Sequence, residues 1–323
     1  MIQEIRKPVE KYFEQYTQAL DKAMYSDNPM LQNIAEHVKK SRGKQLRPLL
    51  VLLSAALCGK VTEHSISSAV SLELLHTASL IHDDVVDDAV ERRSQPSVKA
   101  IWNNKVAILS GDFFLSKVLQ IISSIPYAEI IQSIGKLGAT LSEGEIEQLS
   151  FSKDFSANQE AYFQIIKKKT ASLFSTCTYA GALTSGASSQ MAKQLEIFGG
   201  CLGVAFQIKD DIFDYFEHNN IGKPIGNDLS EGKLTLPLIY ALSQYNDQAA
   251  QYRDFLSTNT QSLSREKVCE IYDFAKAQGG IDYAEQMMES YRQKAIDSLS
   301  AFEESPMKTA MLQLLDYCIK RNY

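Results

Sequence analysis

Apolar residues recur at steps of three and four along almost the whole chain, and this periodicity constrains the fold more than any other feature. One such stripe contains Leu72, Leu75, Leu80 and Val86, and another runs from Phe163 to Cys177. Residues at this spacing share one face of an α-helix. We find no convincing series of alternating β segments joined by hairpin turns. The pattern therefore predicts an all-α protein.

The length allows a large core, because 45% of the 323 residues are apolar. No linker, low-complexity segment or solenoid repeat divides the chain, so we expect one domain over residues 1–323, a single large helical bundle. The net charge of −6 argues against a protein that coats nucleic acid, which needs a strong basic excess.

Cysteine usage and the apolar runs predict a cytoplasmic protein without a transmembrane segment. The cysteines are odd in number and form no C-x-x-C motif, which is typical of unpaired thiols in a reducing compartment. The amino-terminal segment is charged and amphipathic, unlike a secretory signal. The longest apolar stretch, Leu49 to Cys58, is far shorter than the about 20 residues of a membrane span.

Two acidic clusters predict a metal site. In the segment HTASLIHDDVVDDAVERRS, Asp83 and Asp87 lie one helical turn apart, about 6 Å along the axis, with Asp84 beside them. In FQIKDDIFD, four residues share one helix face at i, i+3, i+4 and i+7: Gln207, Asp210, Asp211 and Asp214. Mg²⁺ relieves the repulsion of such carboxylates and takes phosphate oxygens as further ligands. Either cluster alone could be a solvated helix end, but two clusters favour metal binding from both sides of a cavity.

Basic residues near these clusters favour a diphosphate as the bound group. Arg and Lys pair well with phosphate oxygens, whereas surface ion pairs, the alternative, are worth only ~0–1 kcal/mol each. Lys169 lies among apolar helix positions, unlike Lys167 and Lys168, which we assign to a solvated face. The candidates are Lys44, Arg47, Arg92, Arg93, Lys169, Lys223 and Lys233. The glycine-rich segment around Lys223 and Lys233 fits an ordinary loop or a lid over phosphate, and a lone histidine such as His76 is more often a core residue.

Other catalytic classes are disfavoured, because the P-loop, dinucleotide-binding, zincin and nucleophile-elbow motifs do not occur in their required context. The chain instead resembles the trans-isoprenyl diphosphate synthases (polyprenyl synthetases) over nearly its whole length. GKQLRP, LLHTASLIHDDVVDDAVERRS, SGDFFLS, KKTASLF, FQIKDDIFD, GKPIGNDL and GKLTLP stand in the family's order. One departure is Ser94, where the family usually has Gly.

The resemblance implies an all-α isoprenoid-synthase fold around a deep central cavity, usually as a homodimer. It implies that Asp83, Asp84, Asp87 and Asp210 bind Mg²⁺, with Asp211 and Asp214 as further candidates, and that three ions bind per site with substrate. Arg92, Lys169, Gln207, Lys223 and Lys233 would hold an allylic diphosphate. Lys44, Arg47, His76 and Arg93 would hold isopentenyl diphosphate.

The implied reaction is head-to-tail condensation. Ionisation of the allylic C–O bond leaves a carbocation and diphosphate, and the metal and cationic side chains stabilise the departing charge. The hydroxyl of Thr170, the amide oxygen of Gln207 and the carbonyl of Lys169 are candidates to face the carbocation. No protein base stands out, so we expect the released diphosphate to take the proton.

Product length should depend on the residues one turn before Asp83, where Ala78 and Ser79 are both small. An open floor there predicts a long product, about C30 to C50. Alternatively, Ala78 packs on a neighbouring helix and a bulkier residue closes the cavity elsewhere.

The competing functions are a short-chain synthase making farnesyl or geranylgeranyl diphosphate, a terpene cyclase, and a non-catalytic partner subunit. We interpret Lys320 and Arg321 as exposed charge rather than as residues that close the site.

Overall fold

The computed structural model describes residues 1–154, 158–216, 226–258 and 263–320. Of these described residues, 80% are helical. Within these ranges the only strands are β1 (Glu91–Arg92) and β2 (Gln95–Pro96), which form a single antiparallel hairpin. The prediction of an all-α protein is confirmed.

The chain divides into two compact units. Unit 1 contains Met1–Gly138, Thr176–Glu196 and Ala301–Gln313, and unit 2 contains Ala139–Ser175, Ile197–Ser300 and Leu314–Tyr323. Four limits between the units fall inside the helices α8 (Ala128–Asp154), α10 (Ser172–Thr184), α11 (Ser189–Phe213) and α17 (Pro306–Lys320), and the fifth, Ser300/Ala301, precedes α17.

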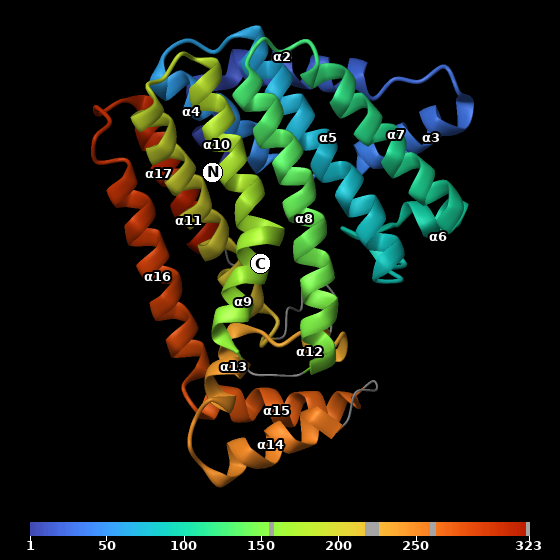
Figure 1. The fold of residues 1–323 in the computed structure, drawn as a ribbon, viewed down its shortest axis with the longest axis vertical. Coiled ribbons are helices and arrows are strands. Elements are labelled where there is room, and N and C mark those ends of the chain that lie inside the picture. The colour runs from blue at the N-terminus through green and yellow to red at the C-terminus, as the bar shows by residue number, and fades with distance from the viewer. Residues whose placement is uncertain (155–157, 217–225, 259–262, 321–323) are drawn as a thin grey trace. The chain divides into compact units, whose positions relative to one another are not determined.

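Unit 1 is built around α4 and α5. The other complete helical elements of this unit are α1 (Ile2–Arg6), the 3₁₀ turn η1 (Lys7–Val9), α2 (Glu10–Ala23), α3 (Pro29–Lys40), α6 (Val98–Trp102) and α7 (Asn104–Ile122). Helix α4 (Leu46–Cys58) is apolar on every side and almost fully buried, as expected of a core helix. Helix α5 (Glu63–Val86) begins at a capping box in which Thr62 and Ser65 satisfy each other's backbone N–H groups, and it lies beside α7 (Figure 1).

Unit 2 contains the second half of α11 and a group of shorter helices. Its complete elements are α9 (Gln159–Ile166), the π-helix η2 (Lys167–Ala171), α12 (Asn227–Ser230), α13 (Leu236–Leu242), α14 (Asp247–Thr258), α15 (Arg265–Ala277) and α16 (Gly280–Ser298). Helix α13 is buried and packs against α15 and α16. The stacked rings of Tyr215 and Tyr272, 3.9 Å apart between centroids, join the end of α11 to α15.

Two findings concern the predictions on membrane spans and on cysteine pairing. Among the described residues, no helix is both long enough and apolar enough to cross a membrane. All five cysteines lie in the described part of the chain and are free thiols, as the sequence predicted.

Candidate active site

The first acidic cluster lies at the carboxyl end of α5. The backbone N–H of Asp87 donates to the carbonyl of Asp83 at 2.8 Å, which confirms that these residues stand one helical turn apart. Asp87 is exposed and Asp83 is half-buried, whereas Asp84 is only 3% exposed. The carboxyl end of a helix carries the negative end of its dipole. Carboxylates placed there repel both the dipole and one another, so the cluster favours a cation.

Asp84 already has a cationic partner. Its carboxylate accepts a hydrogen bond from Nε of Arg92 at 2.5 Å, and the two groups form an ion pair. Burial raises the pKa of Asp84, and the charge and hydrogen bond of Arg92 act in the opposite direction. The predicted metal ligand Asp84 and the predicted diphosphate ligand Arg92 are therefore bound to each other in this structure.

The β1–β2 hairpin carries this arginine. Its two-residue loop, Arg93–Ser94, has positive φ at both positions, 54° and 59°. Such a turn matches the twist of a hairpin and normally contains glycine. Here Ser94 adopts a left-handed conformation that glycine adopts without strain.

Arg93 lies against the loop that precedes α4. Its guanidinium donates to the carbonyl of Ser41 at 2.9 Å. A Cβ atom on Gly43 would lie 2.7 Å from the guanidinium carbon of Arg93, so a larger residue at position 43 would displace this side chain. Lys44 is exposed beside this contact and Arg47 is half-buried in the first turn of α4. Three of the four residues predicted to hold isopentenyl diphosphate thus lie on or against this one loop.

The fourth, His76, lines a pocket of about 60 Å³ in unit 1 together with Arg92 and Arg93. Burial first, and then the charges of Arg47, Arg93 and Arg92, hold the pKa of His76 well below its usual value, so the imidazole is neutral. Its Nε2 is buried without a hydrogen-bond partner. This unsatisfied nitrogen is available to a bound ligand.

Two further residues of this pocket, Arg42 and Glu73, were missed by the sequence analysis. Arg42 donates to Asp21 at 2.8 Å. Burial raises the pKa of Glu73, while Arg47, Arg93 and Arg42 lower it, which places one acidic group among three basic ones. Arg42 adjoins the GKQLRP motif, but no spacing rule links Glu73 to these arginines.

The second acidic cluster lies at the carboxyl end of α11. Asp211 is 3% exposed, and both oxygens of its carboxyl group accept hydrogen bonds: Oδ2 from the Tyr162 hydroxyl at 2.6 Å and Oδ1 from Nε2 of Gln207 at 2.9 Å. Burial and the nearby charge of Asp228 raise the pKa of Asp211, whereas these hydrogen bonds lower it. Asp210 is half-buried on the same helix.

Asp214, the last residue of this cluster, holds the chain that follows. It accepts from the backbone N–H groups of Asn227 and Asp228 at 3.0 and 3.1 Å and from the Tyr272 hydroxyl at 2.6 Å. Asp228 was not predicted as a site residue. Burial, and then repulsion by Asp214, raise the pKa of Asp228 to about 7, with Asp210 also contributing and Lys233 opposing. Four carboxylates of unit 2 therefore repel one another.

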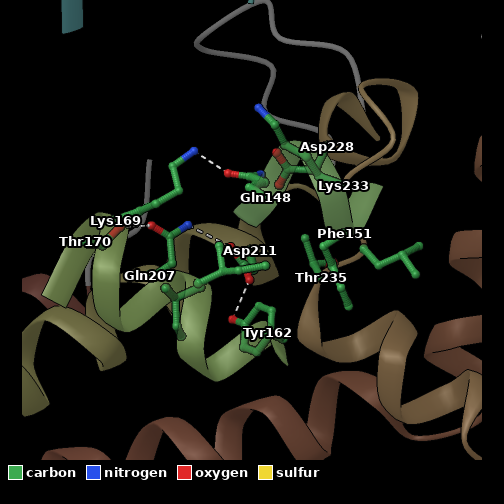
Figure 2. Close-up of a pocket in the computed structure, with 13 residues that line it drawn as sticks. Gln148, Phe151, Tyr162, Lys169, Thr170, Gln207, Asp211, Asp228, Lys233 and Thr235 are labelled. Carbon is green, nitrogen blue, oxygen red and sulfur yellow. Dashed lines mark hydrogen bonds between the residues drawn. The ribbon is translucent and has the colours of Figure 1, made fainter. Parts of the chain in front are cut away.

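A pocket of about 170 Å³ in unit 2 brings the remaining candidates together (Figure 2). Its polar lining includes Lys169, Thr170, Gln207 and Lys233, and its apolar lining includes Phe151, Ile165, Ile166 and Leu234. The Thr170 hydroxyl donates to Oε1 of Gln207 at 2.7 Å. The polar lining also includes the carboxyl groups of Asp211 and Asp228, so the pocket combines apolar side chains with both ammonium and carboxyl groups.

Lys169 reaches this pocket from the π-helix η2, a local widening that is common at functional sites. Its ammonium group pairs with Glu145 at 2.6 Å and also contacts Gln148 (Figure 2). As predicted, Lys167 is exposed, and Lys168 pairs with Glu143 and Glu147 on the outside. Lys223 lies outside the described residues.

The residues predicted to control product length are on α5. Ala78 is fully buried in unit 1, and the Ser79 hydroxyl donates to the carbonyl of His76 at 2.9 Å. Lys320 pairs with Asp316 at 2.9 Å and is exposed, as expected, whereas Arg321 lies outside the described residues.

The two clusters suit a metal only in part. In the described part of the chain, no three His, Cys, Asp or Glu side chains come together to hold an ion by themselves. Mg²⁺ is commonly bound by one or two carboxylates, and substrate phosphates and water fill its other positions. Crowded carboxylates at two helix carboxyl ends fit that mode of binding.

Comparisons with known proteins agree with this chemistry. The sequence model of the polyprenyl synthetase family matches residues 28–274. Octaprenyl diphosphate synthase of Haemophilus influenzae is 33% identical, over 100% of this chain and 98% of that protein. A polyprenyl synthase of Caulobacter crescentus CB15, solved with calcium and isoprenyl diphosphate, has a TM-score of 0.92 at 28% identity, covering 99% of this chain and 98% of the other. Geranylgeranyl pyrophosphate synthase of Bacteroides thetaiotaomicron has a TM-score of 0.86 at 39% identity, covering 99% of both.

Proposed function

Because this chain belongs to the polyprenyl synthetase family, and is therefore a prenyltransferase, we propose that it makes a long-chain all-trans polyprenyl diphosphate. It would condense an allylic diphosphate repeatedly, head to tail, with isopentenyl diphosphate. The single observation that carries this proposal is the unit 2 pocket, where Lys169 and Lys233 edge an apolar lining.

Magnesium dependence is general in the family, and we assign the metal ligands here to Asp83, Asp87 and Asp210. Bound Mg²⁺ would neutralise the charge that develops on the leaving diphosphate. Asp84, Asp211 and Asp214 are further candidates, and their carboxyl groups also accept hydrogen bonds from within the chain. We assign them to positioning Arg92, Gln207 and the segment after α11.

The other residues divide between the two substrates. Lys169, Lys233, Lys223 and Arg92 would bind the allylic diphosphate. Lys44, Arg47, Arg93 and the neutral His76 would bind isopentenyl diphosphate. In this structure Lys169 pairs with Glu145, so diphosphate binding would exchange that carboxylate for phosphate oxygens.

The pocket lining also protects the reaction. Phe151, Ile165, Ile166 and Leu234 exclude water that would quench an allylic cation. The oxygens of Thr170 and Gln207 present negative dipoles to that cation. The carboxyl groups of Asp211 and Asp228 line this pocket and, among its described residues, no histidine does; we assign the released diphosphate as the proton acceptor.

The direct test supplies the purified chain with isopentenyl diphosphate, Mg²⁺ and each allylic primer in turn, and sizes the dephosphorylated products by chromatography. We expect repeated incorporation and a narrow distribution of about C30 to C50. A C15 or C20 product would instead support the short-chain alternative, for which the similarity to geranylgeranyl pyrophosphate synthase of Bacteroides thetaiotaomicron is the specific observation. Absence of incorporation by the chain alone would contradict the proposal and favour a partner subunit.

We base the longer product on the small side chains of Ala78 and Ser79, one turn before Asp83; neither residue lines the two pockets described above. We expect Ala78→Tyr to shorten the product. Since Ala78 is fully buried, overpacking would also cost about 1–3 kcal/mol of stability, so the thermal midpoint is measured alongside. An unchanged product from a folded variant would remove Ala78 from the argument.

The same proposal includes one domain over residues 1–323, a cytoplasmic location and a homodimer. The free thiols support a reducing compartment. Exposed apolar side chains on α7, with Leu109 and Leu119 each 65% exposed, support a subunit contact there. Sedimentation of the wild type and of Leu109→Glu measures the oligomeric state, and we expect a dimer for the wild type and a monomer for the variant. If both proteins are dimers, the α7 surface is not the subunit contact.

A further inference from the structure

Four residues of the unit 2 pocket form one continuous hydrogen-bonded chain (Figure 2). The Tyr162 hydroxyl donates to Oδ2 of Asp211 at 2.6 Å, and Nε2 of Gln207 donates to Oδ1 of Asp211 at 2.9 Å. The Thr170 hydroxyl donates to Oε1 of Gln207 at 2.7 Å. Tyr162 comes from α9, Thr170 from η2, and the other two from α11.

The direction of the hydrogen bonds in this series matters because the amide of Gln207 has a donating nitrogen and an accepting oxygen. With Asp211 accepting from its Nε2, Gln207 turns its oxygen toward Thr170. The single hydroxyl hydrogen of Thr170 is then committed to Gln207, and its lone pairs are left for the pocket. If the amide were reversed, its N–H would face the Thr170 oxygen, and the hydroxyl hydrogen would be released.

Tyr162 contributes to this order without any polar contact of its own to Thr170. It is 4% exposed, and its hydroxyl occupies the Asp211 oxygen that Gln207 does not use. Removing that hydroxyl leaves the carboxyl group free to turn, so that the amide of Gln207 loses its fixed partner.

We propose that Tyr162, acting through Asp211, is a positioning residue that fixes the amide of Gln207 and so makes the Thr170 hydroxyl present lone pairs, rather than its hydrogen, to the allylic cation. This inference rests on the proposed function, since an allylic cation is the species that needs those lone pairs. It also gives Asp211, within the second acidic cluster, a task different from metal binding.

The test measures steady-state kinetics of Tyr162→Phe, Thr170→Val and the double variant. We expect Thr170→Val to lower kcat by about 100-fold and Tyr162→Phe by about tenfold. In the Thr170→Val background, Tyr162→Phe should have no further effect, because no hydroxyl is left to orient. A purely structural role of Tyr162 would lower kcat equally in both backgrounds, and that result overturns the inference.

Binding is a second readout that does not depend on turnover. The affinity for an inert thiolodiphosphate analogue of the allylic substrate should change less than about twofold in Tyr162→Phe, because Lys169 and Lys233 are untouched. The concentration of Mg²⁺ at half-maximal rate should also stay constant. A large loss of analogue affinity, or a rise in the Mg²⁺ requirement, would show that Tyr162 supports binding instead.

Tyr252→Phe is a matched control. The Tyr252 hydroxyl donates to Glu270 at 2.7 Å, so it also makes a tyrosine–carboxylate hydrogen bond in unit 2, but Tyr252 does not line the pocket. We expect this variant to keep wild-type kcat. All rates are expressed relative to the wild type. A wild type that incorporates no isopentenyl group contradicts the proposed function. An active wild type with an equally active Tyr162→Phe contradicts this inference alone.

Discussion

The two acidic clusters have the same D-D-x-x-D spacing and lie at the carboxyl ends of two long helices, α5 and α11, but their buried members have different partners. Asp84 and Asp211, the second aspartates, are each 3% exposed. Asp84 pairs with the cation Arg92, whereas Asp211 is held by the neutral donors Tyr162 and Gln207.

The third aspartates differ as well. Asp87 is exposed at the end of α5, whereas Asp214 accepts from two backbone N–H groups and from Tyr272. The same sequence pattern therefore places an exposed aspartate at the end of α5, and at the end of α11 an aspartate that accepts hydrogen bonds from the segment that follows. The comparison teaches that aspartate spacing alone does not identify the metal ligands.

The largest expected effect is on turnover. Asp83→Asn and Asp210→Asn should each lower kcat about 10²–10³-fold, because each removes a charge assigned to the metal–diphosphate group. Initial rates over a range of Mg²⁺ concentrations provide the measurement. Asp88→Asn is the control, since Asp88 adjoins the first cluster but is exposed and pairs with Lys99. Near-normal rates in either variant would contradict the assignment of that aspartate as a metal ligand.

The next effect is on stability and separates the buried aspartates. Asp84→Asn should lower the free energy of unfolding by about 2–3 kcal/mol, because it leaves Arg92 without its charge partner. Asp211→Asn should cost less than about 1 kcal/mol, since a lost hydrogen bond is offset by relief of repulsion from Asp228 and Asp210. Urea unfolding without metal measures both, and the reverse order would contradict this account.

The pH dependence of protein stability tests the raised pKa of Asp228 in unit 2. The pKa of Asp228 is about 7 in the folded protein and about 3.9 in an unfolded chain. The folded state therefore holds the extra proton between these values, and stability falls as pH rises through that range, by up to about 1.4 kcal/mol per pH unit. Metal-free unfolding from pH 5 to pH 8 should show a steeper fall for the wild type than for Asp228→Asn. Equal slopes would refute the raised pKa.

The smallest effect concerns the hairpin after the first cluster. Ser94→Gly should stabilise the protein by less than about 1 kcal/mol, because relief of the left-handed conformation at φ 59° exceeds the entropy that glycine adds to the unfolded chain. Thermal unfolding is sufficient to detect it. Ser94→Val should destabilise, because a β-branched residue disfavours positive φ, and a stabilised valine variant would contradict the turn assignment.

Local patterns in the sequence determined the helices and the candidate residues. Apolar spacing predicted helical structure in α5 and from Phe163 to Cys177, because this signal depends on residues within one or two turns. The ordered motifs identified the family, and they supplied as candidates five of the thirteen residues that line the pocket in unit 2: Lys169, Thr170, Gln207, Asp211 and Lys233. The small hairpin and the π-helix were not predicted, since each depends on backbone conformations that no periodic pattern indicates.

Only the tertiary structure decided what each aspartate does. The hydrogen bond from Tyr162 to Asp211 joins residues 49 positions apart, and the bond from Tyr272 to Asp214 joins residues 58 positions apart. Such partners are selected by packing between helices, and identical aspartates then acquire a charged partner, a neutral one or a capping role. The sequence by itself determined which residues carry the chemistry, whereas burial and long-range hydrogen bonds determined how that chemistry is divided among them.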